Sequence, residues 1–202
     1  MGTILKGAID DVASIRSLLV ESKKQFHIHI DAALFGGYLP FIEEEFCESL
    51  MLVADTITLS IQKFFGVPLS AGLVLVKNIL HTQVGIDNNI GYINSFDSTI
   101  SGSRNGAAAI MAYHIIKTKE KAAFANEARE MIARAQMLHQ ELVKRNIHCG
   151  LLPKSNTVYF DKPKKEIVNK WQLAWHENTA HVVVMPHVTE AVIREFLADI
   201  DA

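Results

Sequence analysis

Short apolar strands alternate with helical segments along this chain, and that alternation constrains its fold most strongly. The stretch "AGLVLVK" (71–77) is a β-branched and apolar strand that follows a turn with Gly66 and Pro68. Residues 10–24 carry apolar side chains at helical spacing, with aspartates at the start and lysines at the end, which suits the helix dipole. Near-continuous apolar strands between helices predict an α/β fold whose sheet is buried on both faces.

The second half of the chain has a different pattern. Residues 78–103 are rich in Asn, Gly, Ser and Asp and are predicted to form a loop region, which at this length is usually functional. Two helices are predicted next, at about 104–117 and over 120–146. From Ile147 on, the strands "CGLLP", "NTVYFDK" and "AHVVVMP" alternate with the helices "KEIVNKWQLA" and "TEAVIREFLADI". We therefore predict part of a large α/β domain at 1–120 and a small α+β domain at 121–202.

Composition excludes several classes of function. With 21% charged residues and a formal net charge of -2, the chain has no basic stripe, so we expect no nucleic-acid partner. The most apolar stretch, residues 49–61, contains Asp55 and is too short to cross a bilayer, so we expect no membrane partner. Cys47 and Cys149 give neither a zinc spacing nor a disulfide framework. Free thiols and no visible signal peptide predict a cytoplasmic protein.

The stretch "HIHIDAALFG" (27–36) is the first candidate site. His27 and His29 share one face of a strand and could bind a metal, but no third ligand stands at a recognisable spacing, so we predict none. Asp31 lies at the carboxyl end of that strand, where ligands collect in open α/β sheets. A carboxylate there can hold a protonated ring nitrogen, and Ala32 and Ala33 would leave room for a flat ring.

A lysine 32 positions after Asp31 completes the pattern. Lys63 alone would be a surface residue with a buried stem. Paired with Asp31, it could be a desolvated amine of lowered pKa that forms a Schiff base. Ser60 and Gln62 flank it with donors suited to a phosphate, and "TISGSRNG" (99–106) offers backbone N–H groups at a helix start. A pyridine nitrogen, an aldehyde and a phosphate together indicate pyridoxal 5'-phosphate as the cofactor.

The same stretches carry a resemblance to a known family. The segments "HIHIDAALFGGYLPF", "ITLSIQKFFGVPLSAGLVLVK", "YINSFDSTISGSRNG" and "WQLAWHENTAHVVVMPHVT" resemble the group II pyridoxal-phosphate decarboxylases. The nearest branch contains bacterial histidine decarboxylases and plant serine or histidine decarboxylase-like enzymes. The resemblance implies the large domain of fold type I, present in part, followed by the small domain. It also implies a homodimer that converts an L-amino acid to its amine and carbon dioxide.

The resemblance also implies roles for individual residues. Lys63 corresponds to the Schiff-base lysine, Asp31 to the carboxylate paired with the pyridine nitrogen, and Ala33 to the residue against the ring. The remaining cofactor-binding positions are Ser60 and Gln62 at the phosphate, Thr3 in a loop near the cofactor, and Ser101, Gly102 and Ser103 in a loop from the neighbouring subunit. His181, Trp171 and Trp175 belong to the resemblance, but we expect them only to pack.

Two departures leave the function open between alternatives. The family has "SGHK" or "NPHK" where this sequence has "SIQK", so Ile61 replaces a small residue and is predicted to crowd the turn, at about 1–3 kcal/mol. The resemblance also covers only the C-terminal half of such enzymes, which predicts an exposed sheet edge. The chain would then be either a C-terminal part that a separate N-terminal chain completes, or an inactive remnant that serves as a dimerising or binding module.

Overall fold

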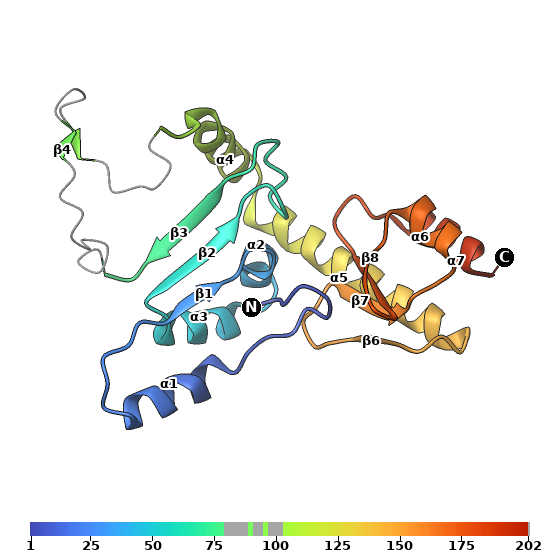
Figure 1. Cartoon of the computed structure of the whole chain (residues 1–202). Helices are drawn as coiled ribbons and strands as arrows, with labels where there is room; N and C mark the ends of the chain where they lie inside the picture. The colour runs from blue at the N-terminus through green and yellow to red at the C-terminus, as the bar shows by residue number, and fades with distance from the viewer. Residues whose placement is uncertain (79–88, 91–94, 97–102, 202) are drawn as a thin grey trace.

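The computed structural model describes residues 1–78, 89–90, 95–96 and 103–201, in which a long helix joins a three-stranded and a four-stranded sheet (Figure 1). The first sheet consists of β1 (His29–Asp31), β2 (Thr56–Ser60) and β3 (Gly72–Val76), in that order. The helices around it are α1 (Val12–Glu21), α2 (Phe35–Tyr38), the 3-10 turn η1 (Leu39–Phe41) and α3 (Glu44–Val53). A separate antiparallel pair, β4 (Asn89–Ile90) and β5 (Ser95–Phe96), lies within the predicted loop region, and α4 (Gly106–Thr118) follows.

The first sheet is covered on one face only. Ile28, Ile30 and Ala32 are buried with Leu50 and Ala54 of the α3 segment. On the opposite face of β1 the side chains are exposed, and β3 is exposed at every position. The prediction of a sheet buried on both faces is therefore wrong for the part of the chain that the structure describes. The apolar β3 sequence has no element packed over it within these ranges.

The second sheet is antiparallel throughout. Its order is β6 (Cys149–Leu151), β7 (Thr157–Asp161), β9 (Thr179–Val183) and β8 (Ala174–His176). The helices α6 (Lys165–Trp171) and α7 (Glu190–Asp201) belong to the same unit. The helix predicted over "KEIVNKWQLA" is too long, because Gln172 adopts a left-handed conformation (φ 51°) at which α6 ends. Residues from Ala174 form β8 instead, which the sequence analysis missed.

One hydrophobic core joins the two sheets through α5 (Lys121–Lys144), the long helix that crosses Figure 1. Phe35 and Tyr38 of α2 and Phe64 after β2 belong to the same cluster as Met131 and Leu138 of α5. Phe41 stacks on Phe124 of α5 with ring centroids 5.0 Å apart. These contacts hold the end of the first sheet against the second, and the candidate site lies between them.

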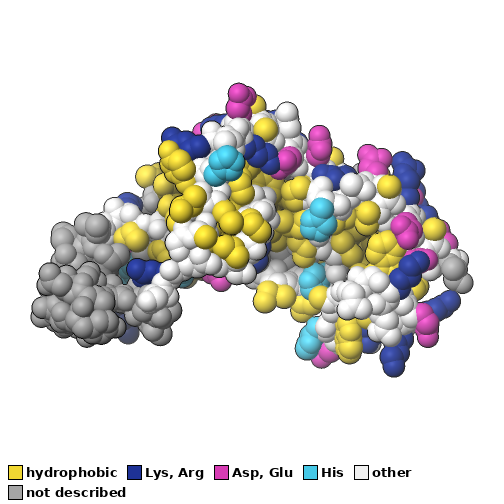
Figure 2. Space-filling model, turned by 90° about the horizontal axis from the view of Figure 1, so that it is seen from above, with side chains coloured by type: hydrophobic (Ala, Val, Ile, Leu, Met, Phe, Trp, Pro, Cys, Tyr) yellow, Lys and Arg dark blue, Asp and Glu magenta, His cyan; other side chains and the backbone are white. Residues whose placement is uncertain are grey.

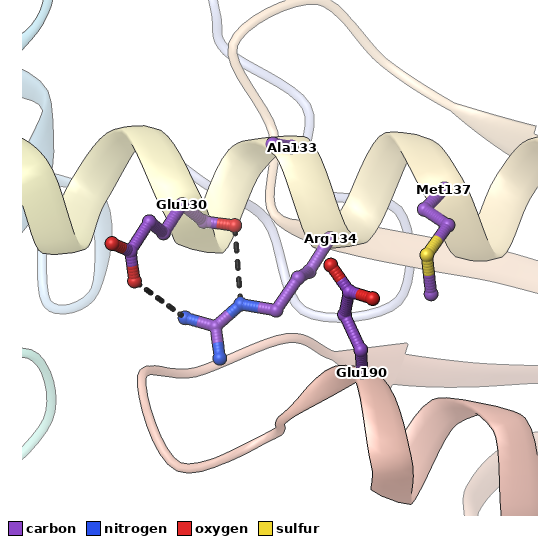
Figure 3. Close-up of a pocket in the computed structure, with 5 residues that line it drawn as sticks. All are labelled: Glu130, Ala133, Arg134, Met137 and Glu190. Carbon is purple, nitrogen blue, oxygen red and sulfur yellow. Dashed lines mark hydrogen bonds and ion pairs between the residues drawn. The ribbon is translucent and has the colours of Figure 1, made fainter.

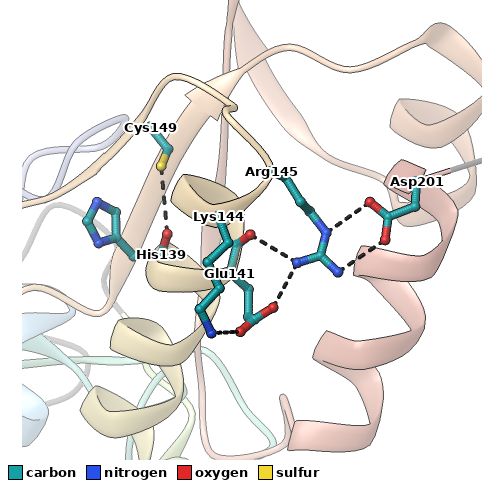
Figure 4. A network of polar contacts seen from close by, with 6 residues as sticks. All are labelled: His139, Glu141, Lys144, Arg145, Cys149 and Asp201. Carbon is teal, nitrogen blue, oxygen red and sulfur yellow. Dashed lines mark hydrogen bonds and ion pairs between the residues drawn. The ribbon is translucent and has the colours of Figure 1, made fainter.

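The far end of α5 is tied to α7 by polar contacts (Figure 4). Arg145 donates to both carboxylate oxygens of Asp201, at 2.9 and 3.1 Å, and to the Glu141 carboxylate at 2.8 Å. Hydrogen bonds from Lys144 and Arg145 hold the pKa of Glu141 below its ordinary value. Because these groups lie at the surface, we expect them to orient α7 rather than to contribute much stability.

Candidate functional site

The carboxyl ends of β1 and β2 meet at one edge of the first sheet because the two strands are parallel. Asp31 is aligned with Thr58, and the Ala32 amide donates to the Thr58 carbonyl at 2.8 Å. One residue further on, the Ser60 amide donates to the Ala33 carbonyl at 3.0 Å. The two stretches that the sequence analysis combined therefore lie side by side, with Lys63 three residues beyond this last hydrogen bond.

Asp31 has a largely unengaged carboxylate at this edge. Its Oδ1 accepts the Ala33 amide at 3.0 Å, and within the described residues the carboxylate has no other partner. The neighbouring His29 is engaged, because its ring nitrogens lie 2.8 Å from the Thr56 hydroxyl and 3.2 Å from the Thr58 hydroxyl. Across the described ranges, no group of three or more His, Cys, Asp or Glu side chains could hold a metal ion.

Lys63 lines a cavity of about 400 Å³ between the two sheets, but its side chain is exposed, so the prediction of a desolvated amine is wrong within the described chain. The first part of the chain contributes Gly2, Thr3, Ile4, Leu34, Gln62 and Lys63. The second sheet and the loop after it contribute Thr157, His181, Val183, Met185 and His187. The Lys63 amine makes no hydrogen bond or ion pair with any residue in the described part of the chain. The volume is in the range of small-molecule sites.

Ile61 and Gln62, the two residues of "SIQK" that differ from the family pattern, lie in the turn after β2. Ile61 is only 5% exposed and packs with Leu59 and Val67 in a small apolar cluster, and the predicted crowding of the turn stays a prediction. Gln62 accepts the Ala71 amide through Oε1 at 3.2 Å. That bond uses the carbonyl end of the side chain and leaves its NH₂ group as a donor at the cavity.

Thr3 reaches the cavity from a tight turn at residues 2–8. The Thr3 hydroxyl accepts the Ala8 amide at 3.0 Å, and the Gly7 amide donates to the Thr3 carbonyl at 2.8 Å. Gly7 has a φ of +66°, and a Cβ there would overlap the Ser155 hydroxyl next to the second sheet. The turn that presents Thr3 therefore depends on a glycine at position 7.

We expect Gly7→Ala to destabilise the fold more than Gly66→Ala. Gly66 also has a positive φ, +70°, but has no atom within 4 Å of an added Cβ. The Gly66 variant should lose about 1–2 kcal/mol from the left-handed backbone alone, and the Gly7 variant a further ~1–3 kcal/mol from the overlap. Urea denaturation of both variants checks this, and equal losses would contradict the proposed role of the Ser155 contact.

Several predicted site residues lie outside the cavity. Asp31, Ala33 and Ser60 are at the adjoining strand edge but do not line it. Ala32 is fully buried, so only Ala33, which is half-buried, could offer the space that the sequence analysis assigned to both alanines. Ser103 is exposed ahead of α4, while Ser101 and Gly102 fall outside the described residues.

The residues of the second sheet that line the Lys63 cavity were not predicted from the sequence. His181 and Val183 alternate along β9, so they share a face, and Thr157 of β7 is paired with Val183 on that face. His181 was expected only to pack, whereas it lines the cavity. The available signal was the pair of histidines that flank the apolar run in "HVVVMPH" (181–187), but sequence alone does not tell which face of this strand meets Lys63.

A second hollow, of about 440 Å³, lies between α5 and the start of α7 (Figure 3). Arg134 lines this hollow, and its guanidinium group already has hydrogen-bond partners. It donates to the carbonyls of Pro186 and Val188 at 3.1 and 2.9 Å, and to the Glu130 carbonyl at 3.1 Å. Arg134 thereby fixes the loop that carries His187 into the Lys63 cavity. We assign this hollow a structural role.

The chain is similar to known proteins in both sequence and fold. Residues 1–157 match the family described as the pyridoxal-dependent decarboxylase conserved domain. Serine decarboxylase 1 of Oryza sativa subsp. japonica is 36% identical, over 99% of this chain and 42% of that enzyme. Histidine decarboxylase of Vibrio campbellii is 35% identical, over 98% of this chain and 52% of that enzyme. An L-methionine decarboxylase structure from Streptomyces shares the fold with a TM-score of 0.86 at 23% identity, over 98% of this chain and 52% of that one.

The chain therefore belongs to the pyridoxal-dependent decarboxylase family, and its α/β fold is that of fold type I. It is similar along nearly its whole length to histidine and serine decarboxylases, as the sequence analysis predicted. It spans about half the length of these curated relatives. None of the helices in the described ranges has the length and hydropathy needed to cross a membrane.

Proposed function

We propose that this chain is the C-terminal portion of a pyridoxal-phosphate-dependent amino-acid decarboxylase, with Lys63 as the residue that forms a Schiff base. One observation carries the proposal. Asp31 ends β1 and Lys63 follows β2, the adjacent parallel strand, and the Ala33–Ser60 hydrogen bond joins the two segments; the Asp31 carboxylate accepts only the Ala33 amide among the described residues. L-Histidine is our first choice of substrate and L-serine the second, because relatives along nearly the whole chain carry those names.

Each predicted site residue of this chain would have its own role in binding the cofactor. Bound pyridoxal phosphate supplies an electron sink for the pair left on Cα when carbon dioxide departs. Asp31 would keep a proton on the pyridine nitrogen, because a nearby negative charge raises the pKa of that nitrogen. The Gln62 NH₂ group and the Ser60 hydroxyl would donate to the phosphate. Ala33 would lie against the ring, and Thr3 would lie close to it.

Residues beyond this sequence would complete the site, either on a separate N-terminal chain or in a homodimer. In this proposal residues 1–120 are part of the large domain and 121–202 form the small one. Two surfaces support a partner: β3 is exposed at every position, and α4 exposes Ile110, Tyr113 and Ile116. Figure 2 shows hydrophobic side chains on the upper side of the molecule, where α4 lies in Figure 1. The cytoplasmic location stays a prediction.

The alternative is an inactive remnant that acts at most as a binding or dimerising module. One observation favours it: Asp31 and Ser60 do not line the cavity into which Lys63 opens. In this alternative the fold would persist, but the cofactor would have no complete binding site.

Reconstitution distinguishes the two. The chain would be purified alone, and also co-expressed with the segment of the Vibrio campbellii histidine decarboxylase that it does not match. Each sample would receive pyridoxal phosphate and L-histidine or L-serine, and the amine product would be measured by mass spectrometry. We expect amine from the co-expressed pair. If that pair forms a stable complex yet yields no amine from either amino acid, the remnant is the correct description.

A further inference from the structure

His181 carries a polar atom that the fold leaves without a partner. In the described part of the chain, its Nδ1 is the one buried side-chain nitrogen or oxygen that makes no hydrogen bond. The ring belongs to β9, where His181 is paired with Tyr159 on one side and Ala174 on the other. Buried polar atoms are almost always hydrogen-bonded, so this exception limits which nitrogen of the His181 ring can carry the proton.

The surroundings determine where the proton of His181 resides. Burial lowers the pKa of the imidazole, so the ring is neutral near pH 7. An N–H at the sealed Nδ1 would have no acceptor, and an orphaned N–H is rarer in proteins than an acceptor that lacks a donor. The proton therefore belongs on Nε2, which makes the ring a neutral hydrogen-bond donor at the cavity.

The cavity is chemically suited to an anion. None of the residues that line it is an aspartate or glutamate, and its titratable side chains are Lys63, His181 and His187. Leu34, Val183 and Met185 make the remaining wall largely apolar. A carboxylate entering this space would lose water and would find Nε2–H of His181 on the wall opposite Lys63.

We propose that His181 donates its Nε2–H to the carboxylate of the amino-acid substrate and so orients the group that leaves as carbon dioxide. The inference rests on the proposed function. A neutral donor suits this task better than a cation, because a full positive charge would stabilise the carboxylate of the ground state more than the departing, neutral carbon dioxide. The apolar wall acts in the same direction by keeping water from the carboxylate.

Equilibrium binding tests the inference without turnover. The chain, completed by the Vibrio segment and loaded with pyridoxal phosphate, would carry Lys63→Ala to prevent reaction. Calorimetry would then compare L-histidine with histamine, which lacks the carboxylate. We expect His181→Phe to weaken L-histidine binding about tenfold and to leave histamine binding unchanged. His181→Gln should restore most of the affinity, because its amide can place an N–H near the Nε2 position. His176→Phe, an exposed histidine on β8, is the matched control.

Three results would overturn the inference. Equal weakening of both ligands by His181→Phe would indicate a packing role. Unchanged binding of L-histidine would exclude the contact. Loss of L-histidine binding between pH 6 and 8, with histamine unaffected, would indicate a charged ring instead of a neutral donor. Failure of the proposed function would look different, because the protein with Lys63 intact would then show no Schiff-base absorbance with pyridoxal phosphate.

Discussion

Replacing Lys63 with alanine is expected to abolish the visible absorbance that appears when the protein binds pyridoxal phosphate. Only a primary amine forms a Schiff base with the cofactor aldehyde, and Lys63 is the lysine that lines the cavity. In the reconstituted enzyme, the rate of amine formation should fall by a factor on the order of 10³ or more, as for other residues that form a covalent bond with the reacting group. Absorbance titration and product measurement on the same samples check both parts.

Lys121→Ala is the control for this experiment. Lys121 is an exposed lysine whose ammonium group pairs with Glu44 at 2.8 Å, away from the cavity, so its removal should leave the absorbance unchanged. If Lys63→Ala retained the band while Lys121→Ala or another lysine variant lost it, the assignment of the Schiff base to Lys63 would be wrong. Addition of a small primary amine should partly restore the rate of Lys63→Ala if the cavity is otherwise intact.

The second large effect concerns the core that joins the two sheets. Leu138→Ala should destabilise the protein by about 2–5 kcal/mol, because the side chain is fully buried on α5 and its removal leaves a cavity. Val143→Ala, on the same helix but 53% exposed, should change stability by no more than about 0.5 kcal/mol. Urea denaturation followed by tryptophan fluorescence and by far-UV circular dichroism measures both variants.

The two signals carry separate information about Leu138. Both tryptophans, Trp171 and Trp175, lie in the unit of the second sheet, whereas circular dichroism reports on the whole chain. Since one core joins the sheets, both signals should shift to the same lower urea concentration. A shift in fluorescence alone would mean that the two sheets unfold independently, and the wall opposite Lys63 would then not be held in place by α5.

The type of most elements could be predicted from the sequence, and the joint role of Asp31 and Lys63 stays a prediction from it. Helical spacing predicted α1, α4 and α5, and β-branched runs predicted β2, β3, β7 and β9, because these patterns are local. The motifs around Asp31 and Lys63 sufficed for the family, which the comparisons confirmed. Asp31 ends a strand and Lys63 follows one, and ligands collect where parallel strands end, so local order alone indicated a shared edge.

Which groups meet at that edge depends on how segments far apart in the chain pack together. His181 is 118 positions from Lys63, and no local pattern states that β9 turns its His181 face toward the lysine. The same limit applies to Ile61, whose place in the turn follows from the sequence but whose packing with Leu59 and Val67 does not. It also explains the exposed β3, since an apolar strand is buried only where another element covers it. Burial and cavity walls depend on contacts between distant segments, and these are fixed only when the sheets pack around α5.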